Sequence, residues 1–295
     1  MTDFFGIPIQ ALMGQLMLGL VNGAFYSLLS LGLAVIFGML NIVNFAHGAL
    51  YMVGAFFAWM LLNYAGVNYW FALFLAPIGV GIIGVLIEKI LLGWIRQLDH
   101  LYGLLLTFGL ALIFEGVFRE FYGSSGMPYE LPAVFRGVFD LEFMMLPKYR
   151  AWVVLVSVVL CLATWYVIEK TRLGAYLRAG TENPDLVKAF GINVPLMVTL
   201  TYAFGVGLAG LAGVMAAPIY QVSPLMGSNI IIVVFAVVVI GGMGSILGSI
   251  VTGLSLGLIE GLTKVFYAEL STTVVFIIMA VVLLVRPAGL FGREK

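Results

Sequence analysis

The chain has 295 residues, of which 63% are hydrophobic and 9% are charged, and its formal net charge is zero. Soluble domains carry about 25% charged residues, so this composition excludes an ordinary soluble enzyme, and it provides no basic surface for nucleic acid. Apolar and polar residues do not alternate with a period of two, which argues against an outer-membrane barrel. We therefore expect an all-α, polytopic membrane protein with about 8–10 transmembrane helices.

Nine apolar runs follow one another along the chain, and each is a candidate membrane helix because about 20 apolar residues span a bilayer. They lie at about 11–37, 49–62, 70–87, 104–121, 151–168, 196–217, 230–240, 249–263 and 272–285. No lysine or arginine precedes Lys89, so the first run is expected to be a retained span and not a signal peptide. The whole chain, 1–295, is interpreted as a single transmembrane domain.

The positions of the basic residues set the expected orientation, because cytoplasmic loops are enriched in lysine and arginine. Placing 88–100, 169–195 and the C-terminal tail in the cytoplasm puts nine of the 14 basic residues there. The segment 123–150 has prolines and charges of both signs. We expect it to be an extracytoplasmic loop that folds as a small surface element.

Two interruptions of the apolar pattern are candidates for the lining of a path through the membrane. The first holds Asn41, Asn44, His47 and Gly48, and the second holds Gly242, Gly244 and Ser245 within GGMGSILG. Irregular backbone at membrane depth is tolerated where it lines a cavity or is covered by protein. At this point two interpretations stay open: a broken segment beside a substrate path, or polar side chains that satisfy the backbone at helix ends.

The segment 169–195 must lie in water, because seven charged residues lie between Glu169 and Lys188, and each would cost about 2.5–3.5 kcal/mol at a bilayer centre. Its second half predicts a short helix over 183–191. Asn183 is a suitable N-cap, Pro184 suits the first turn, Asp185 favours the helix dipole, and Gly191 is a natural stop. Leu186, Ala189 and Phe190 would form a small apolar face. Docking onto a partner and lying on the protein itself both remain open.

Other features have structural interpretations. Small residues recur at four-residue spacing in three rows, which predicts close helix packing. The first row is Gly19 and Gly23, the second is Gly205, Ala209, Gly213 and Ala217, and the third is Gly253, Gly257 and Gly261. Two pairs of opposite charge lie near the predicted outer ends of their spans. In each pair a glutamate precedes a basic residue by four positions: Glu115 precedes Arg119, and Glu260 precedes Lys264. Pairing along the helix explains both better than a proton relay does.

The sequence supplies no catalytic constellation, no metal-ligand spacing and no cofactor motif. The GSSG at 123–126 has the letters of a serine-protease motif, but both histidines, His47 and His100, precede it and the serines lie in a polar loop. Cys161 is the one cysteine. The glycine-rich break at 241–248 lacks the lysine of a phosphate-binding loop. We therefore expect a protein that is not an enzyme.

Several stretches together resemble the LivH-type permease subunits of ABC importers for branched-chain amino acids. They are GLVNGAFYSLLSLGL at 19–33, MLNIVNFAHGALYMVGAF at 39–56, DHLYGLLLTFGL at 99–110, RAGTENPDLVKAFGINV at 178–194, GGMGSILGS at 241–249 and VRPAGLFG at 285–292. The resemblance covers nearly the whole chain. Ser27, Ser30 and Ser249 stand where many relatives have alanine, which leaves the identity of the substrate open.

The resemblance implies a bacterial cytoplasmic (inner) membrane location, a second, LivM-like permease subunit, two ATP-binding subunits and an extracytoplasmic substrate-binding protein. It also implies that the helix at 183–191 couples to the ATPase, through Glu182, Asn183, Pro184, Asp185, Lys188 and Gly191. The expected cargo is a branched-chain or similar aliphatic amino acid. Alternatives are urea or short amides, other amino acids, an ion-coupled secondary transporter and a membrane enzyme.

Overall fold

The structure is a computed structural model that describes residues 3–4, 7–40, 42–95, 98–141 and 144–292. Within these ranges, seven helices are long and apolar enough to cross a membrane. They are α1 (Ile9–Leu40), α2 (Ala46–Ala65), α3 (Tyr69–Leu86), α5 (His100–Tyr122), α6 (Lys148–Lys170), α9 (Val194–Tyr220) and α11 (Ile246–Phe266). Two shorter apolar helices are α10 (Met226–Gly241) and α12 (Val274–Val285). Every predicted apolar run is thus helical, and the all-α membrane fold is confirmed.

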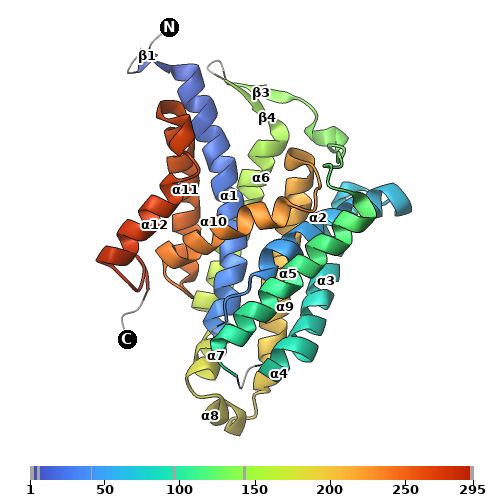
Figure 1. The fold of residues 1–295 in the computed structure, drawn as a ribbon, viewed down its shortest axis with the longest axis vertical. Coiled ribbons are helices and arrows are strands. Elements are labelled where there is room, and N and C mark those ends of the chain that lie inside the picture. Colours follow the sequence, from blue (N-terminus) through green and yellow to red (C-terminus); the bar gives the residue numbers. More distant parts are fainter. Residues whose placement is uncertain (1–2, 5–6, 41, 96–97, 142–143, 293–295) are drawn as a thin grey trace.

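Helices α1, α6, α9 and α11 run along the long axis of the molecule, and many connecting elements gather at its two ends (Figure 1). One end holds β1 (Asp3–Phe4), β2 (Ile7–Pro8), the 3-10 turn η2 (Ala133–Phe135), β3 (Val138–Asp140) and β4 (Met145–Pro147). The opposite end holds α7 (Arg172–Glu182) and α8 (Pro184–Ala189). The segment 123–150, predicted to be outside, and the segment 169–195, predicted to be inside, therefore lie at opposite ends of the bundle.

Helix α10 lies across the bundle instead of along it (Figure 1). Its 16 residues span about 24 Å at a rise of 1.5 Å per residue, which is less than the hydrocarbon thickness of about 30 Å. The turn η3 (Ala268–Leu270) joins α11 to α12, and α12 is shorter still, with 12 residues. Both helices are too short to cross a bilayer by themselves.

Small residues bring α1 into direct backbone contact with α11, and α9 with α2. A Cβ atom added to Gly19 would lie 2.4 Å from the carbonyl oxygen of Gly257, and one added to Gly213 would lie 2.0 Å from that of Tyr51. Side chains are sterically excluded at both crossings. The predicted packing role of the glycine rows is confirmed at these contacts, and close packing of this kind is what holds helices together in lipid.

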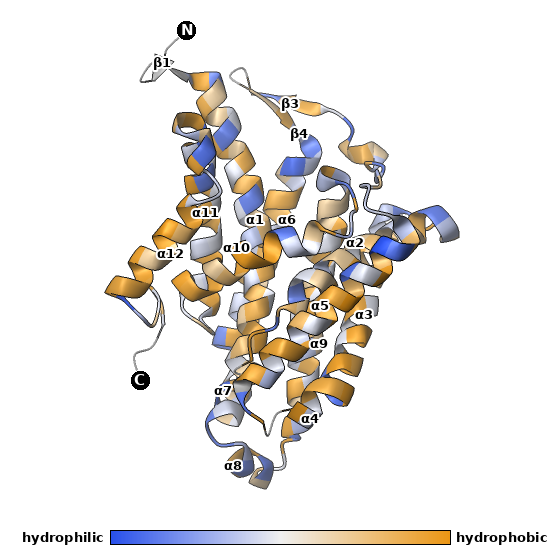
Figure 2. Ribbon diagram, viewed as in Figure 1, coloured by the Kyte–Doolittle hydropathy of each residue, from blue (hydrophilic) through white to orange (hydrophobic). Residues whose placement is uncertain are grey.

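Apolar residues form the lipid-facing surface, and polar residues gather toward the ends (Figure 2). On α3, Phe71, Phe74, Ile78 and Ile82 are each more than half exposed, as expected of side chains that meet lipid tails. At the end that carries the hairpin, aromatic rings pack edge to face, with Tyr69 next to Trp152 at 5.8 Å between centroids. Such aromatic belts mark membrane interfaces.

The loop predicted from residue 88 onward is wrong in its first half. Helix α3 continues as a π-helix, η1 (Ile87–Leu92), and as α4 (Gly93–Ile95). Glu88 is 3% exposed and accepts a 2.5 Å hydrogen bond from the Thr199 hydroxyl of α9. A polar partner on a neighbouring helix keeps this carboxylate inside the bundle, so its charge does not end the span.

The segment 123–150 folds as the small surface element that its composition predicts. Strands β3 and β4 pair in antiparallel register, with Phe139 opposite Leu146. Met127 forms a bridge with Val222 that ties the segment to the end of α9. Burial raises the pKa of Tyr129 to about 12, so this phenol stays protonated at neutral pH.

Candidate functional site

The first sequence break joins α1 to α2, and its polar side chains are buried. Asn41 lies outside the described residues. Asn44 is 1% exposed, and its amide Nδ2 donates to the Tyr202 hydroxyl at 3.0 Å. His47 is fully buried, and its Nε2 donates to the Leu29 carbonyl oxygen at 3.0 Å. Asn44 therefore links the break to α9, and His47 links the start of α2 to α1.

Gly48 is placed where α2 crosses α10. A Cβ atom there would lie 2.6 Å from the carbonyl oxygen of Gly227. Phe45 packs on Phe235 of α10 with ring centroids 5.8 Å apart. The first break thus sits directly against the transverse helix, and any movement of α10 must rearrange this contact.

The second break connects α10 to α11 and has the backbone geometry that its glycines predict. Gly242 and Gly244 have φ values of +98° and +83°, which side chains disfavour. The Ser245 hydroxyl accepts a 3.1 Å hydrogen bond from the Gly248 amide and so caps α11. The C-terminal tail closes this joint, because the Leu290 amide donates to the Ile240 carbonyl oxygen at 2.8 Å.

The segment predicted to couple to an ATPase folds as two helices, α7 and α8, at the end opposite the hairpin (Figure 1). Glu182 ends α7 and is exposed. The Asn183 side chain accepts a 3.0 Å hydrogen bond from the Leu186 amide, and Pro184 occupies the first turn. Asp185 and Lys188 form a 3.0 Å ion pair. Gly191 has φ +80°, so the predicted N-cap and stop are both confirmed.

Only one side of α8 packs against the protein. Val187 is buried in a cluster with Met39, Val194 and Val198. By contrast, Leu186 is 55% exposed and Phe190 is 78% exposed. An exposed phenylalanine beside charged residues, at the water-facing end of a membrane bundle, is a surface suited to binding another protein.

Two buried hydrogen bonds to α9, one from the first break and one from η1, were not predicted from the sequence. Asn44 contacts Tyr202, and one turn earlier on α9 Thr199 contacts Glu88. The sequence shows Gly84, Glu88 and Leu92 at four-residue spacing, which places them on one helix face. The structure shows that all three are buried. The partners were not predictable, since Thr199 lies 111 residues from Glu88 along the chain.

A second missed group lies nearer the hairpin end, between α1, α9 and α11. The Glu260 carboxylate accepts hydrogen bonds from the Tyr26 hydroxyl at 2.7 Å and from Lys264 Nζ at 2.5 Å. Asn22 Nδ2 lies 3.4 Å from the same carboxylate, and its Oδ1 accepts a 2.6 Å bond from the Tyr220 hydroxyl. We call these five residues the outer polar cluster. The predicted Glu260–Lys264 and Glu115–Arg119 pairs are both present.

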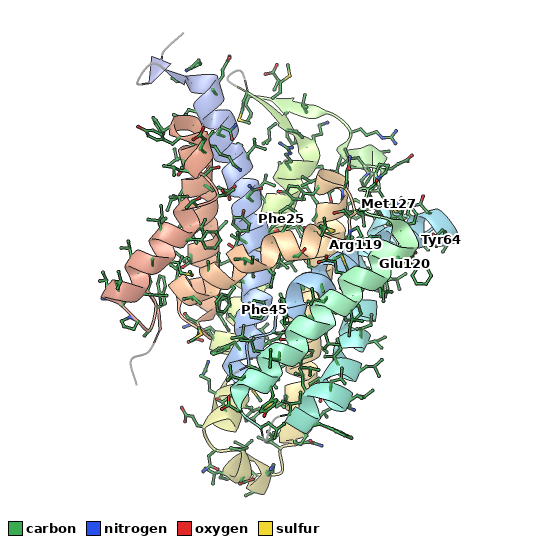
Figure 3. The ribbon with its side chains drawn as sticks, viewed as in Figure 1. Phe25, Phe45, Tyr64, Arg119, Glu120 and Met127 are labelled. Carbon is green, nitrogen blue, oxygen red and sulfur yellow. The ribbon has the colours of Figure 1, made fainter. Side chains whose placement is uncertain are left out.

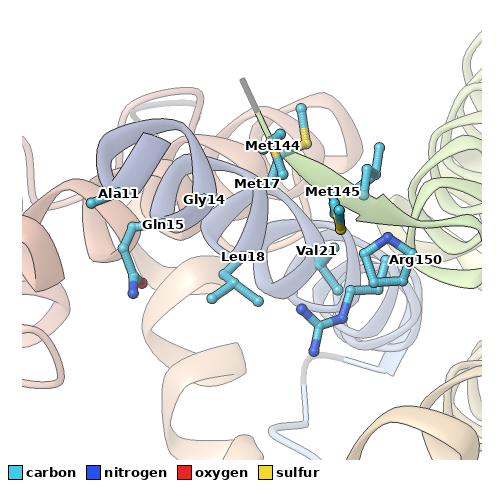
Figure 4. Close-up of a pocket in the computed structure, with 11 residues that line it drawn as sticks. Ala11, Gly14, Gln15, Met17, Leu18, Val21, Met144, Met145 and Arg150 are labelled. Carbon is cyan, nitrogen blue, oxygen red and sulfur yellow. The ribbon is translucent and has the colours of Figure 1, made fainter. Parts of the chain in front are cut away.

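A cavity of about 290 Å³ opens beside this cluster, between α1 and the start of α6 (Figure 4). Gln15, Leu18 and Val21 line it from α1, and Arg150 lines it from α6. Met144 and Met145 cover it from the hairpin. In Figure 3, Phe25 of α1 is seen above α10, and Phe45 of the first break is seen below it.

Comparisons with known proteins agree on one family. A family model described as branched-chain amino acid transport system / permease component matches residues 15–284. The permease protein LivH of Escherichia coli K12, from a high-affinity branched-chain amino acid transport system, is 28% identical over 95% of this chain and 96% of its own length. BraD of Pseudomonas aeruginosa, the permease protein of such a system, is 30% identical over 95% and 96%. The ribose import permease RbsC of Escherichia coli is 33% identical over 34% of this chain and 33% of its own. No solved structure matches.

Proposed function

The chain belongs to the family of branched-chain amino acid transport permeases, and from this premise we propose that it is the membrane permease subunit of an ATP-driven importer. Its cargo is a branched-chain or similar aliphatic amino acid, as the names of the relatives LivH and BraD indicate for those proteins. The bundle provides helices for alternating access. ATP hydrolysis takes place on other subunits.

The partners follow from this assignment. A second, LivM-like permease subunit completes the membrane path, two ATP-binding subunits drive it from the cytoplasm, and an extracytoplasmic binding protein delivers the amino acid. The complex lies in a bacterial cytoplasmic membrane. The α7–α8 end, with its exposed charges, faces the cytoplasm, and the β3–β4 hairpin faces outward.

Helix α8 is the proposed contact with an ATP-binding subunit, and its exposed apolar face is the single observation that supports this most directly. Leu186 and Phe190 point away from the bundle while Val187 holds the helix to the base of α9. A force on α8 is therefore transmitted to α9, and through Tyr202 to Asn44 in the first break.

The two breaks are the proposed moving parts. Asn44, His47, Gly48, Gly242, Gly244 and Ser245 are, by this proposal, residues beside which the path opens once the helices re-pack. In the described state Asn44 and His47 are buried in hydrogen bonds. The glycines at the α10–α11 joint provide the backbone freedom for such a rearrangement.

Replacing Phe190 by alanine tests the role of α8. We expect uptake of radiolabelled leucine to fall at least tenfold in vesicles from cells that express the whole complex, because the ATP-binding subunit loses its main apolar contact. Membrane insertion should be unchanged. The matched control is Phe121→Ala, since Phe121 is 79% exposed at the other end of the bundle. Equal uptake by both variants would refute the coupling role of α8.

A further inference from the structure

The outer polar cluster lies within the membrane-spanning part of the bundle. Glu260 is six residues before the end of α11, and Asn22 is thirteen residues after the start of α1. At 1.5 Å per residue these positions are about 9 Å and about 20 Å from the respective helix ends. Ionisable side chains at such depth are rare, and they face a protein interior or a water-filled space that serves a transport path.

The cluster is closed on its inner side and open on its outer side. The Glu260 side chain is 8% exposed and is held by Tyr26 and Lys264. In contrast, the Lys264 side chain is 34% exposed, and Tyr220 is 45% exposed. The Lys264 ammonium binds Glu260 and the Tyr220 hydroxyl binds Asn22, and Lys264 and Tyr220 both lie in the last turn of their helices. Long amphipathic side chains at helix ends place their polar tips in the membrane interface, so this side of the cluster is open to water or to the polar surface of another subunit.

One face of α1 connects the cluster to the cavity, which none of the five cluster residues lines. Gln15, Leu18, Asn22 and Tyr26 follow each other at three- and four-residue spacing, which places them on one stripe of the helix. Arg150 lines the cavity, and its charge acts on the Tyr220 hydroxyl, which in turn binds Asn22. The Gln15 Oε1 atom is buried and has no hydrogen-bond partner among the described residues. The cluster thus contains a carboxylate and a cation, on Glu260 and Lys264. The cavity adds the cation of Arg150, the unpaired amide oxygen of Gln15 and an apolar wall.

This combination matches the three parts of an aliphatic α-amino acid. Its ammonium group needs a carboxylate, its carboxylate needs a cation, and its side chain needs an apolar surface. In the cluster, Glu260 provides the first and Lys264 a cation for the second. In the cavity wall, Arg150 provides another cation, and Leu18, Val21 and Met145 provide the third. At about 290 Å³ the cavity is at the small end of ligand pockets, which suits a single amino acid.

We propose that the outer polar cluster and the adjoining cavity form this subunit's half of an outer receiving site, where a zwitterionic amino acid leaves the binding protein before it passes α10. This inference rests on the proposed transport function and assigns a place and a recognition chemistry within it. The Glu260–Lys264 pair opens toward the substrate, so that each side chain exchanges its partner for the oppositely charged group of the zwitterion.

Water access to the cluster is tested by cysteine labelling. The variant Tyr220→Cys is made with Cys161→Ser, since Cys161 is buried and is the one cysteine of the chain. In right-side-out vesicles that contain the whole complex, we expect a membrane-impermeant maleimide to label position 220. Leucine-loaded binding protein should slow that labelling severalfold. Absence of labelling, or a rate indifferent to the loaded protein, would overturn the proposal.

The charge requirement is tested by Glu260→Gln, which keeps the side-chain size and the acceptor for Tyr26. We expect leucine uptake at saturating loaded binding protein to fall at least tenfold. Glu115→Gln is the control, because Glu115 forms a similar i,i+4 pair on α5. If unmodified complex takes up no leucine, the proposed function is wrong; if it does and Glu260→Gln transports normally, only the receiving site is wrong. Tyr220→Phe, a change at an exposed residue, should reduce uptake too. If Glu260 served only to hold α1 against α11, Tyr220→Phe would leave uptake unchanged.

Discussion

Single buried side chains decide how the interrupted helices of this protein are held together. Asn44 and Tyr202 meet across 158 residues of sequence, and His47 binds the backbone of α1. The sequence predicted that the polar residues near 41–48 need partners, because unpaired polar groups are costly in a membrane. Which partners they find depends on how α9 packs, and no local pattern in the sequence contains that information.

Removal of the Tyr202 hydroxyl should show the value of this contact. In Tyr202→Phe the Asn44 amide keeps its place but loses its acceptor, and an unsatisfied buried donor costs about 1–3 kcal/mol. We expect a lower midpoint of thermal unfolding in detergent. Tyr166→Phe is the control, because Tyr166 is 60% exposed on α6. An unchanged midpoint for Tyr202→Phe would show that the hydrogen bond contributes no stability.

At the scale of elements, the helices were predictable and their interruptions were less so. Hydropathy is a local property, and each of the nine apolar runs overlaps one observed apolar helix. The continuation of α3 through Glu88 was missed because a charge in sequence looks like the end of a span. Its buried position depends on Thr199 of α9. Likewise, the transverse orientation of α10 follows from its packing and not from its composition.

Glycine at the α1–α11 crossing should be irreplaceable. A Cβ atom at Gly257 would lie 2.3 Å from the Cα atom of Gly23, so Gly257→Val forces the two helices apart. We expect a large loss of folded protein, measured by size-exclusion chromatography of the detergent extract. Gly109→Val is the matched control, since a side chain at Gly109 meets no atom within 4 Å. Equal yields of the two variants would contradict the close contact of α1 with α11.

The whole molecule must have one fixed orientation in the membrane if α8 is to meet an ATP-binding subunit in the cytoplasm. In the variant Lys188→Cys, the new cysteine on α8 should react with a membrane-impermeant reagent only from the cytoplasmic side. Cysteine at position 145, in the hairpin, should react only from outside. Cys161→Ser is the background for both. Labelling of position 188 from outside would invert the orientation on which the coupling proposal depends.

The most direct test of the central claim is leucine uptake by proteoliposomes that contain the complete complex, with loaded binding protein outside and ATP enclosed. We expect leucine to accumulate only when ATP is hydrolysed, and dissipating the proton gradient to have no effect. Accumulation without ATP that collapses together with the proton gradient would contradict it.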